Sequence, residues 1–154
     1  MSVFLADEQR EQVDLVGLRG LAEIIVKAQS FPSSAELTLL FVDESEMSSY
    51  NKKFLDREGP TDVLAFPVED LTAGEVPEVE NGGPPLILGD VIIAPSYVKR
   101  QAEEMAVTFE DEMALMVTHG ILHLLGYDHQ DDDEAEIMES REAELLAMVG
   151  RSRR

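Results

Sequence analysis

The sequence predicts a single domain in which a small mixed β-sheet packs against helices. Short β-rich apolar segments occur between residues 35 and 94, and segments with the apolar spacing of amphipathic helices surround them. A chain of 154 residues is long enough to bury a core without disulfide or metal support. We therefore expect one domain over residues 1–150, followed by a basic, frayed tail at 151–154.

The first part of the chain predicts two helices separated by a strand. After a short apolar start at residues 3–6, residues 13–28 repeat apolar side chains every three or four positions, as in an amphipathic helix. Asp14 is placed to cap this helix. Residues 35–42 are mostly apolar and β-rich, which is typical of a buried strand, and a second helix is expected at 45–55.

An acidic loop divides the middle of the chain. A turn at 59–62 precedes a short apolar strand at 63–66, and another strand is expected at 86–94. Between the strands, residues 69–85 are rich in Gly, Pro and acidic side chains, a composition that favours an exposed, mobile connection. Because both strands are too short to anchor separate cores, we expect this loop to join neighbours in one sheet.

Three helices are expected after the last strand, at 95–105, 108–125 and 133–149. An acidic run at 131–134 precedes the third of them, where carboxylates interact favourably with the positive end of the helix dipole. We interpret this run as a solvated helix start rather than as a metal site.

The chain is strongly acidic and contains no cysteine. Its 12 Lys and Arg residues against 32 Asp and Glu residues give a formal net charge of −20, which disfavours nucleic acid as a partner. The absence of cysteine excludes disulfides and thiol nucleophiles, and fits the reducing cytoplasm. No secretory leader and no apolar run of about 18 residues occurs, so we expect no membrane association.

The three histidines of the chain lie within eleven residues. His119 and His123 are four positions apart in a helical segment, so their rings share one face and can converge on one ion. Gly126 is placed to end the helix in a left-handed turn that brings His129 to the same ion. Three imidazoles without a carboxylate favour one zinc ion with an open position, although nickel, copper and cobalt bind the same ligands.

The spacing of the histidines matches that of the metzincin peptidases, H-E-x-x-H-x-x-G-x-x-H. Gly120 stands where those enzymes have the glutamate that acts as general base. Peptidase chemistry of that design is therefore disfavoured, whereas hydrolysis by a metal-activated water stays open.

Two further blocks accompany the histidine motif. The segments HGILHLLGYDH at 119–129, GPTDVLAFP at 59–67 and LGDVII at 88–93 together resemble the YbeY family of bacterial zinc-dependent endoribonucleases. The resemblance implies an α+β fold with about five helices around a small mixed sheet, and a zincin-like metal helix. It also implies a cytoplasmic enzyme of ribosomal RNA processing, which matures the 3′ end of 16S rRNA and acts in ribosome quality control.

The resemblance also implies roles for individual residues. His119, His123 and His129 would bind zinc, which would activate a water molecule or stabilise charge on the phosphate. The family carries a basic residue where this chain has Leu55, and the nearest basic side chain is Arg57.

Arg57 and Lys53 are the candidate substrate-binding residues, with a solvated turn position as the alternative for Arg57. Ala65 replaces a serine that is common in the second block. The lining of this cleft is therefore expected to differ from the family pattern at two positions, Leu55 and Ala65.

Three carboxylates lie within these blocks. Asp62 and Asp90 are interpreted as structural hydrogen-bond partners rather than as general bases. Asp128 either orients an imidazole of the metal site or caps the turn beside it. The general base therefore stays unassigned.

The net charge is the main obstacle to an RNA substrate. Cations would have to line one rim of the cleft, and the candidates are Lys52, Lys53, Arg57, Lys99, Arg100 and Arg141. We expect a ribosomal or ribosome-associated protein to assist binding to ribosomal RNA. Two alternatives stay open: a zinc hydrolase of peptides or small molecules, and a non-catalytic ribosome-associated module stabilised by zinc.

Overall fold

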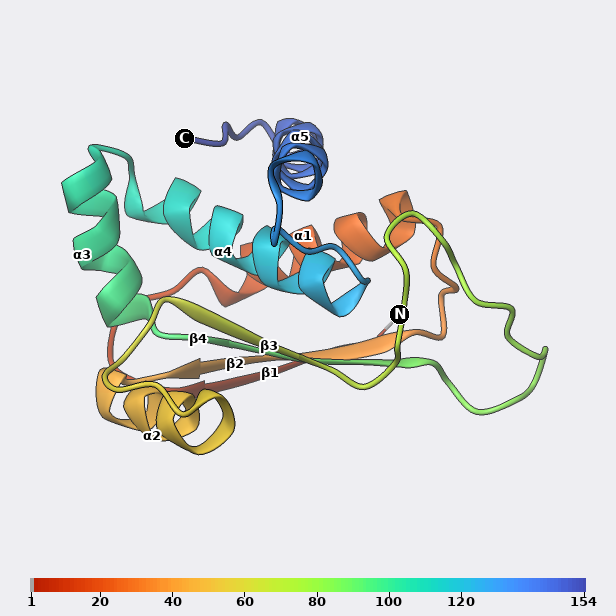
Figure 1. Cartoon of the computed structure of the whole chain (residues 1–154), viewed down its shortest axis with the longest axis horizontal. Helices are drawn as coiled ribbons and strands as arrows, with labels where there is room; N and C mark the ends of the chain where they lie inside the picture. Colours follow the sequence, from red (N-terminus) through yellow and green to blue (C-terminus); the bar gives the residue numbers. More distant parts are fainter. Residues whose placement is uncertain (1) are drawn as a thin grey trace.

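Four strands form one mixed sheet in the order β1-β2-β4-β3 (Figure 1). The computed structural model describes residues 2–154. Strands β1 (Ser2–Glu8), β2 (Glu36–Val42) and β4 (Ile87–Ile93) are parallel, and β3 (Val63–Pro67) is antiparallel to β4. A parallel pair needs a crossover connection, and helix α1 (Leu15–Ala28) provides it between β1 and β2.

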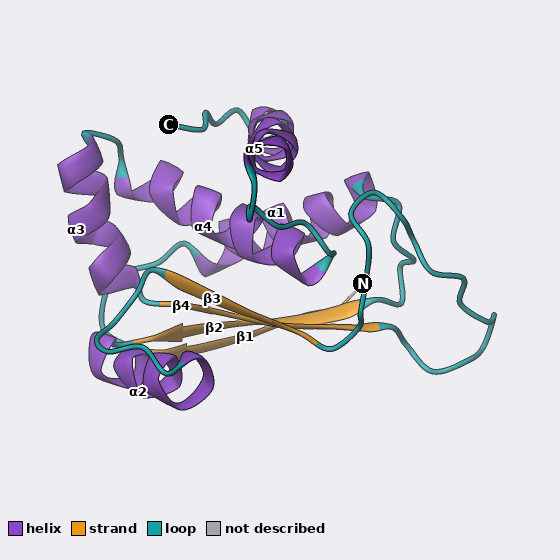
Figure 2. Cartoon of the chain, in the orientation of Figure 1, coloured by secondary structure: helices purple, strands orange, loops and turns teal. Residues whose placement is uncertain are grey.

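Helices cover both faces of the sheet (Figure 2). Helix α2 (Glu44–Leu55) lies on one face, and α1 and α4 (Phe109–Leu124) lie on the other. Helices α3 (Pro95–Met105) and α5 (Asp132–Ala147) pack against α4. The chain is therefore a single α+β domain, as predicted.

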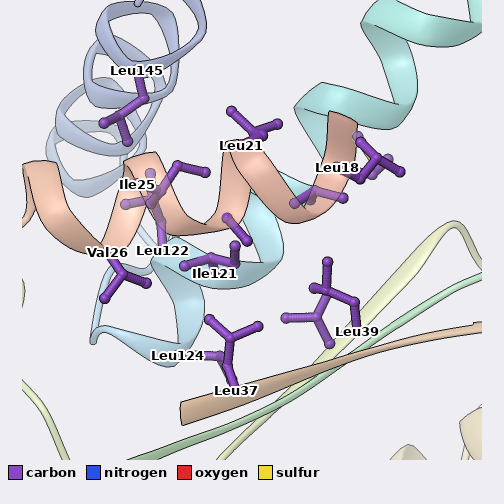
Figure 3. Packing of buried hydrophobic residues seen from close by; sticks show 14 of the residues in the cluster. Leu18, Leu21, Ile25, Val26, Leu37, Leu39, Ile121, Leu122, Leu124 and Leu145 are labelled. Atoms are coloured by element: carbon purple, nitrogen blue, oxygen red, sulfur yellow. The ribbon is translucent and has the colours of Figure 1, made fainter. Parts of the chain in front are cut away.

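Helix α4 is the central helix of the domain, because it contacts β3, β4 and the three helices α1, α3 and α5. All residues from 112 to 118 on this helix are buried. A helix that is apolar on nearly every side is expected in the interior of a domain. Figure 3 shows side chains from α1, α4, α5 and β2 meeting between the helices and the sheet: Leu21, Ile25, Leu37, Leu39, Ile121, Leu122 and Leu145.

Gly120 allows α4 to approach the sheet closely. A Cβ atom at this position would lie 2.5 Å from Cγ1 of Val91 and 3.3 Å from Cγ2 of Val63. Any side chain here would therefore collide with the sheet instead of entering open space.

The predicted elements after residue 12 occur within two residues of their expected bounds. Asp14 caps α1 as expected, because its Oδ1 atom accepts a hydrogen bond from the backbone N of Gly17 at 3.0 Å. Asp131 caps α5 in the same way, which confirms that the acidic run at 131–134 is a helix start. The loop at 69–85 joins two paired strands and is mostly exposed, and its mobility stays a prediction.

Strand β1 is the element that sequence patterning missed. It is an edge strand, paired only with β2, and Val3 is its one buried side chain. Phe4 is 53% exposed, so the usual alternation of buried apolar and exposed polar residues is absent. Pairing with β2 therefore creates this strand more than its own sequence pattern does. No helix among residues 2–154 is long and apolar enough to cross a membrane.

An ion pair joins the start of α2 to α3. Both carboxylate oxygens of Glu44 accept hydrogen bonds from Arg100, and Oε2 also accepts one from Oγ of Ser96 at 2.8 Å. The hydrogen bonds from Arg100 lower the pKa of Glu44, although partial burial opposes this effect. The carboxylate is therefore held in its charged form.

We predict that Glu44→Gln lowers the melting temperature at pH 7 by about 1–4 °C, as expected for loss of a partly exposed ion pair. Because folding lowers the pKa of Glu44 below its reference value of 4.5, this contribution is present above pH 4.5 and is lost as the pH falls through the folded-state pKa. Thermal unfolding over a series of pH values from 7 downward should show the difference from wild type at pH 7 and its decline below pH 4.5. Glu103→Gln, on the exposed surface of α3, is the control. A difference that stays constant over the whole series would contradict this origin.

We predict that Gly120→Ala destabilises the domain by about 1–2 kcal/mol, because overpacking against Val91 outweighs the gain in helix propensity. Gly20→Ala on α1 is the matched control, since nothing lies within 4 Å of a Cβ atom at that position. Urea denaturation should show a loss for the first variant and a gain of up to about 1 kcal/mol for the second. Equal gains in both variants would contradict the close approach of α4 to the sheet.

Candidate metal centre and cleft

The three histidines meet at the C-terminal end of α4. His119 and His123 are on successive turns of this helix, which ends at Leu124. Gly126 then has a φ of +99°, a conformation that favours glycine, and the turn brings His129 back to the other two rings. One nitrogen from each ring lies within 4.8 Å of the others. The structure thus brings together the three side chains that the sequence singled out.

Glu142 of α5 orients the first of these rings. Nδ1 of His119 donates a hydrogen bond to Oε2 of Glu142 at 2.7 Å, and Glu142 is only 1% exposed. This bond leaves Nε2 of His119 facing Nε2 of His123, 3.1 Å away. Two nitrogens bound to one tetrahedral zinc ion at 2.0–2.1 Å would lie about 3.3 Å apart. The spacing of the rings therefore fits a shared ion.

The electrostatics of the cluster favour a neutral His123 and a charged Glu142. Burial lowers the pKa of His123, and the neighbouring His119 and His129 lower it further. Burial by itself would raise the pKa of Glu142, but hydrogen bonds from His119 and Arg153 outweigh it and lower the pKa overall. Neutral imidazole is the form that binds metals, and a carboxylate that accepts its second N–H increases its basicity.

A cleft of about 750 Å³ opens beside the histidines. Two of the three sequence blocks line it, through the histidine motif and through residues 60–67 of the second block. The third block forms β4, which pairs with β3 and supports the second block from within the sheet. The first residues of the acidic loop, 69–71, also line the cleft. The three blocks that resemble the YbeY family are separated in the sequence but lie close together in the fold.

The structure separates the two candidate substrate-binding residues. Arg57 lines the cleft, and its side chain makes no hydrogen bond or ion pair with residues 2–154. Lys53 does not line the cleft, and its ammonium group lies 5.3 Å from the ring centre of Phe54. Leu55, at the family's basic position, lines the cleft with an apolar side chain. Of the two candidates, only Arg57 is placed to meet a substrate there.

The expected cationic rim is wrong for every other residue proposed for it. Lys52 pairs with Asp56 and Glu58, Lys99 with Glu11, Arg100 with Glu44, and Arg141 with Glu144. None of these four cations lines the cleft. Each of these four cations pairs with a carboxylate that does not line the cleft, so sequence position alone does not place a cation at the cleft.

The end of the chain supplies cations that the sequence analysis assigned to a frayed tail. Nε of Arg153 donates to Oε1 of Glu142 at 2.9 Å, and Nε of Arg154 donates to Oε1 of Glu112 at 2.9 Å. Both arginines line the cleft, so the expectation of a frayed end is wrong. The available signal was a glutamate within an apolar helical segment, as at Glu112, because such a carboxylate needs a partner once the fold buries it.

The three carboxylates of the sequence blocks, Asp62, Asp90 and Asp128, differ in their hydrogen bonds. Oδ1 of Asp128 accepts from the backbone N of His129 at 2.8 Å, which confirms the turn-capping interpretation. Asp62 accepts from the backbone N of Val63 at 2.7 Å and from Gln101 at 3.2 Å, as expected of a structural partner. Asp90 is exposed and its side chain makes no hydrogen bond within residues 2–154. The expectation that Asp90 is a structural hydrogen-bond partner is therefore wrong.

Comparison with known proteins agrees with the motifs. The family model described as Endoribonuclease YbeY matches residues 5–150. A relative of that name from Acidothermus cellulolyticus is 39% identical over 100% of this chain and 94% of its own length. Another from Thermobifida fusca is 43% identical over 99% of this chain and 96% of its own length.

A solved structure shows the same fold. The solution structure of TM1509 from Thermotoga maritima superposes with a TM-score of 0.61 and 28% sequence identity, covering 96% of this chain and 91% of that one. The family match and the two relatives extend over the whole histidine cluster and both cleft-lining blocks. This chain therefore belongs to the YbeY endoribonuclease family.

Proposed function

We propose that this protein is a zinc-dependent endoribonuclease of ribosomal RNA processing that acts in maturation of the 16S rRNA 3′ end and in ribosome quality control. The observation that carries the proposal is the convergence of His119, His123 and His129 beside a cleft, in a chain of the YbeY family. The family and the cluster together indicate a metal-dependent nuclease, and RNA is the substrate class named for the relatives.

The donor set supports zinc as the ion. His119, His123 and His129 would hold it through three neutral imidazoles, a set that suits zinc although nickel, copper and cobalt also accept it. The 3.1 Å spacing between Nε2 of His119 and Nε2 of His123 fits ligation by these two atoms. Bound there, the ion supplies Lewis acidity, which stabilises the charge that develops on the phosphate during cleavage.

The side chains around the cluster prepare the site for this chemistry. Glu142 holds His119 in the orientation that directs Nε2 to the ion, and it does so without contact with water because it is 1% exposed. Arg57 has all its side-chain donors available for an RNA phosphate. Arg57 lies in the connection between α2 and β3 and lines the same cleft as the histidines. It can therefore bind the RNA chain there.

The charge of the cleft supports dependence on a partner. Three arginines line it against six carboxylates: Glu58, Asp62, Glu69, Asp70, Asp128 and Glu142. An RNA strand therefore meets a lining that is net negative before the ion is counted. We propose that naked RNA binds weakly and that a ribosomal or ribosome-associated protein holds the ribosomal RNA substrate at this cleft, in the cytoplasm.

The peptidase alternative is not favoured. The metzincin general base would occupy the position of Gly120, whose Cβ direction leads into Val91 of the sheet. A glutamate there would clash with the sheet and would not reach a substrate. The family match likewise favours RNA over peptide substrates.

We predict that His119→Ala, His123→Ala and His129→Ala each lose bound zinc and reduce cleavage of a ribosomal RNA precursor by about a thousandfold. This magnitude is expected when several kcal/mol of metal-derived transition-state stabilisation is removed. Metal analysis of the natively purified proteins and a cleavage assay measure the two effects. Gln130→Ala, an exposed neighbour of His129, is the control.

Loss of zinc without loss of cleavage would contradict the proposed mechanism. Unstructured protein, incubated in parallel with the wild-type enzyme, tests the alternative substrate. Metal-dependent proteolysis without RNA cleavage would overturn the assignment to ribonucleases.

We predict that Glu142→Gln weakens zinc binding by about 10–100-fold, because an amide holds the His119 ring less firmly and makes it less basic than a carboxylate does. Competition with a zinc-binding dye measures the affinity without reference to catalysis. Glu136→Gln, on the exposed side of the same helix, is the control and should bind zinc as the wild type does. Equal affinity in both variants would show that the hydrogen bond to His119 does not support the ion.

A further inference from the structure

Two buried glutamates hold the C-terminal arginines at the cleft. Glu112 on α4 and Glu142 on α5 are each 1% exposed. Glu112 accepts hydrogen bonds from Nε of Arg154 at 2.9 and 3.0 Å, and Glu142 accepts one from Nε of Arg153 at 2.9 Å. Charge-assisted bonds to buried carboxylates fix the position of a guanidinium group. The two arginines are therefore held in place and are not loosely exposed cations.

The two guanidinium groups differ in what they have left to donate. Arg153 uses Nη1 to donate to the backbone oxygen of Arg154 at 2.8 Å, and its Nη2 lies 3.4 Å from Glu139. Arg154 donates only through Nε, and its two Nη groups make no hydrogen bond with residues 2–154. Its side chain is 29% exposed and lines the cleft. Arg154 thus presents the two Nη groups of an anchored guanidinium to the cleft that the histidines also line.

Arg154 has one counterpart in the cleft. Among the cleft-lining cations within residues 2–154, only Arg57 and Arg154 retain terminal donors without a protein partner. Arg57 comes from the connection before β3, and Arg154 comes from the segment after α5, which lies above α4 in Figure 1. The two cations therefore reach the cleft from separate parts of the chain.

We infer that Arg154 is a substrate-binding residue, which contacts an RNA phosphate through its Nη groups while Glu112 anchors it through Nε. The inference rests on the proposed function. The two Nη groups of a guanidinium match two phosphate oxygens, a geometry that lysine does not reproduce. Anchoring by Glu112 reduces the conformational freedom that the long side chain would otherwise lose on binding. Arg154 then supplies positive charge where the cleft otherwise has mostly carboxylates.

The test is the double variant Arg154→Ala with Glu112→Gln. It leaves net charge unchanged, and the new amide can still accept the hydrogen bond that Gln101 donates to Glu112 at 2.8 Å. The fold is therefore expected to survive. Arg151→Ala with Asp111→Asn is the matched control, because it removes another ion pair of the same segment, at 2.8 Å, which does not line the cleft.

Binding of a single-stranded RNA oligonucleotide is followed by fluorescence anisotropy over a series of salt concentrations. The Arg154 double variant is expected to bind about tenfold more weakly than the control, as for loss of one charge-assisted contact. Its plot of log K against log salt concentration should be shallower by about 0.7. KM for a cleavable RNA should rise about as much, with kcat, zinc affinity and melting temperature equal to those of the control. Arg154→Lys should recover the salt dependence but only part of the affinity.

The outcomes separate this inference from the proposed function. RNA affinity and salt dependence equal to those of the control would overturn the inference alone. Unfolding or loss of zinc in the double variant would assign Arg154 a structural role and would also overturn it. Absence of cleavage when the wild-type protein with zinc is given a ribosomal RNA precursor in complex with its ribosomal proteins would overturn the proposed function, and the inference with it.

Discussion

The burial of helix α4 is the constraint on which the rest of the structure depends. This helix contacts two strands and three helices, so its apolar residues form much of the core. Gly120 lets it lie against Val91, and the same close contact leaves no room for a catalytic side chain at that position. His119 and His123 are half-buried at the end of the helix, where it borders the cleft. One packing arrangement therefore sets both the core and the position of the site.

Burying α4 between other helices places carboxylates where water does not reach them. Glu112 and Glu142 are satisfied by Arg154 and Arg153, and Glu142 also accepts a hydrogen bond from His119. A buried carboxylate without a partner is costly, so the C-terminal segment and the helices stabilise each other. This network links the end of the chain to the histidine cluster through a single side chain, Glu142.

The acidic composition of the chain extends from the surface into the cleft, where carboxylates outnumber arginines. Exposed cations such as Lys52, Lys99 and Arg100 are neutralised by nearby carboxylates and lie outside the cleft. The cations at the cleft are few, and one of them, Arg154, is anchored by a hydrogen bond to the buried Glu112. A net charge of −20 is therefore compatible with an RNA substrate only through local placement of charge and, as we propose, through a partner.

The sequence was sufficient for the features that depend on local order. The i, i+4 spacing of His119 and His123 and the glycine that ends their helix follow from helix geometry, so the histidine cluster and most element bounds were predictable. Folding was needed for contacts between distant segments: β1 is defined by its pairing with β2, and Glu142 meets His119 across 23 positions. Arg153 and Arg154 look like a solvated tail in the sequence, because the residues next to them do not indicate that they pair with buried glutamates of α4 and α5. Local periodicity records how a segment folds, whereas partners of buried charges depend on which segments the fold brings together.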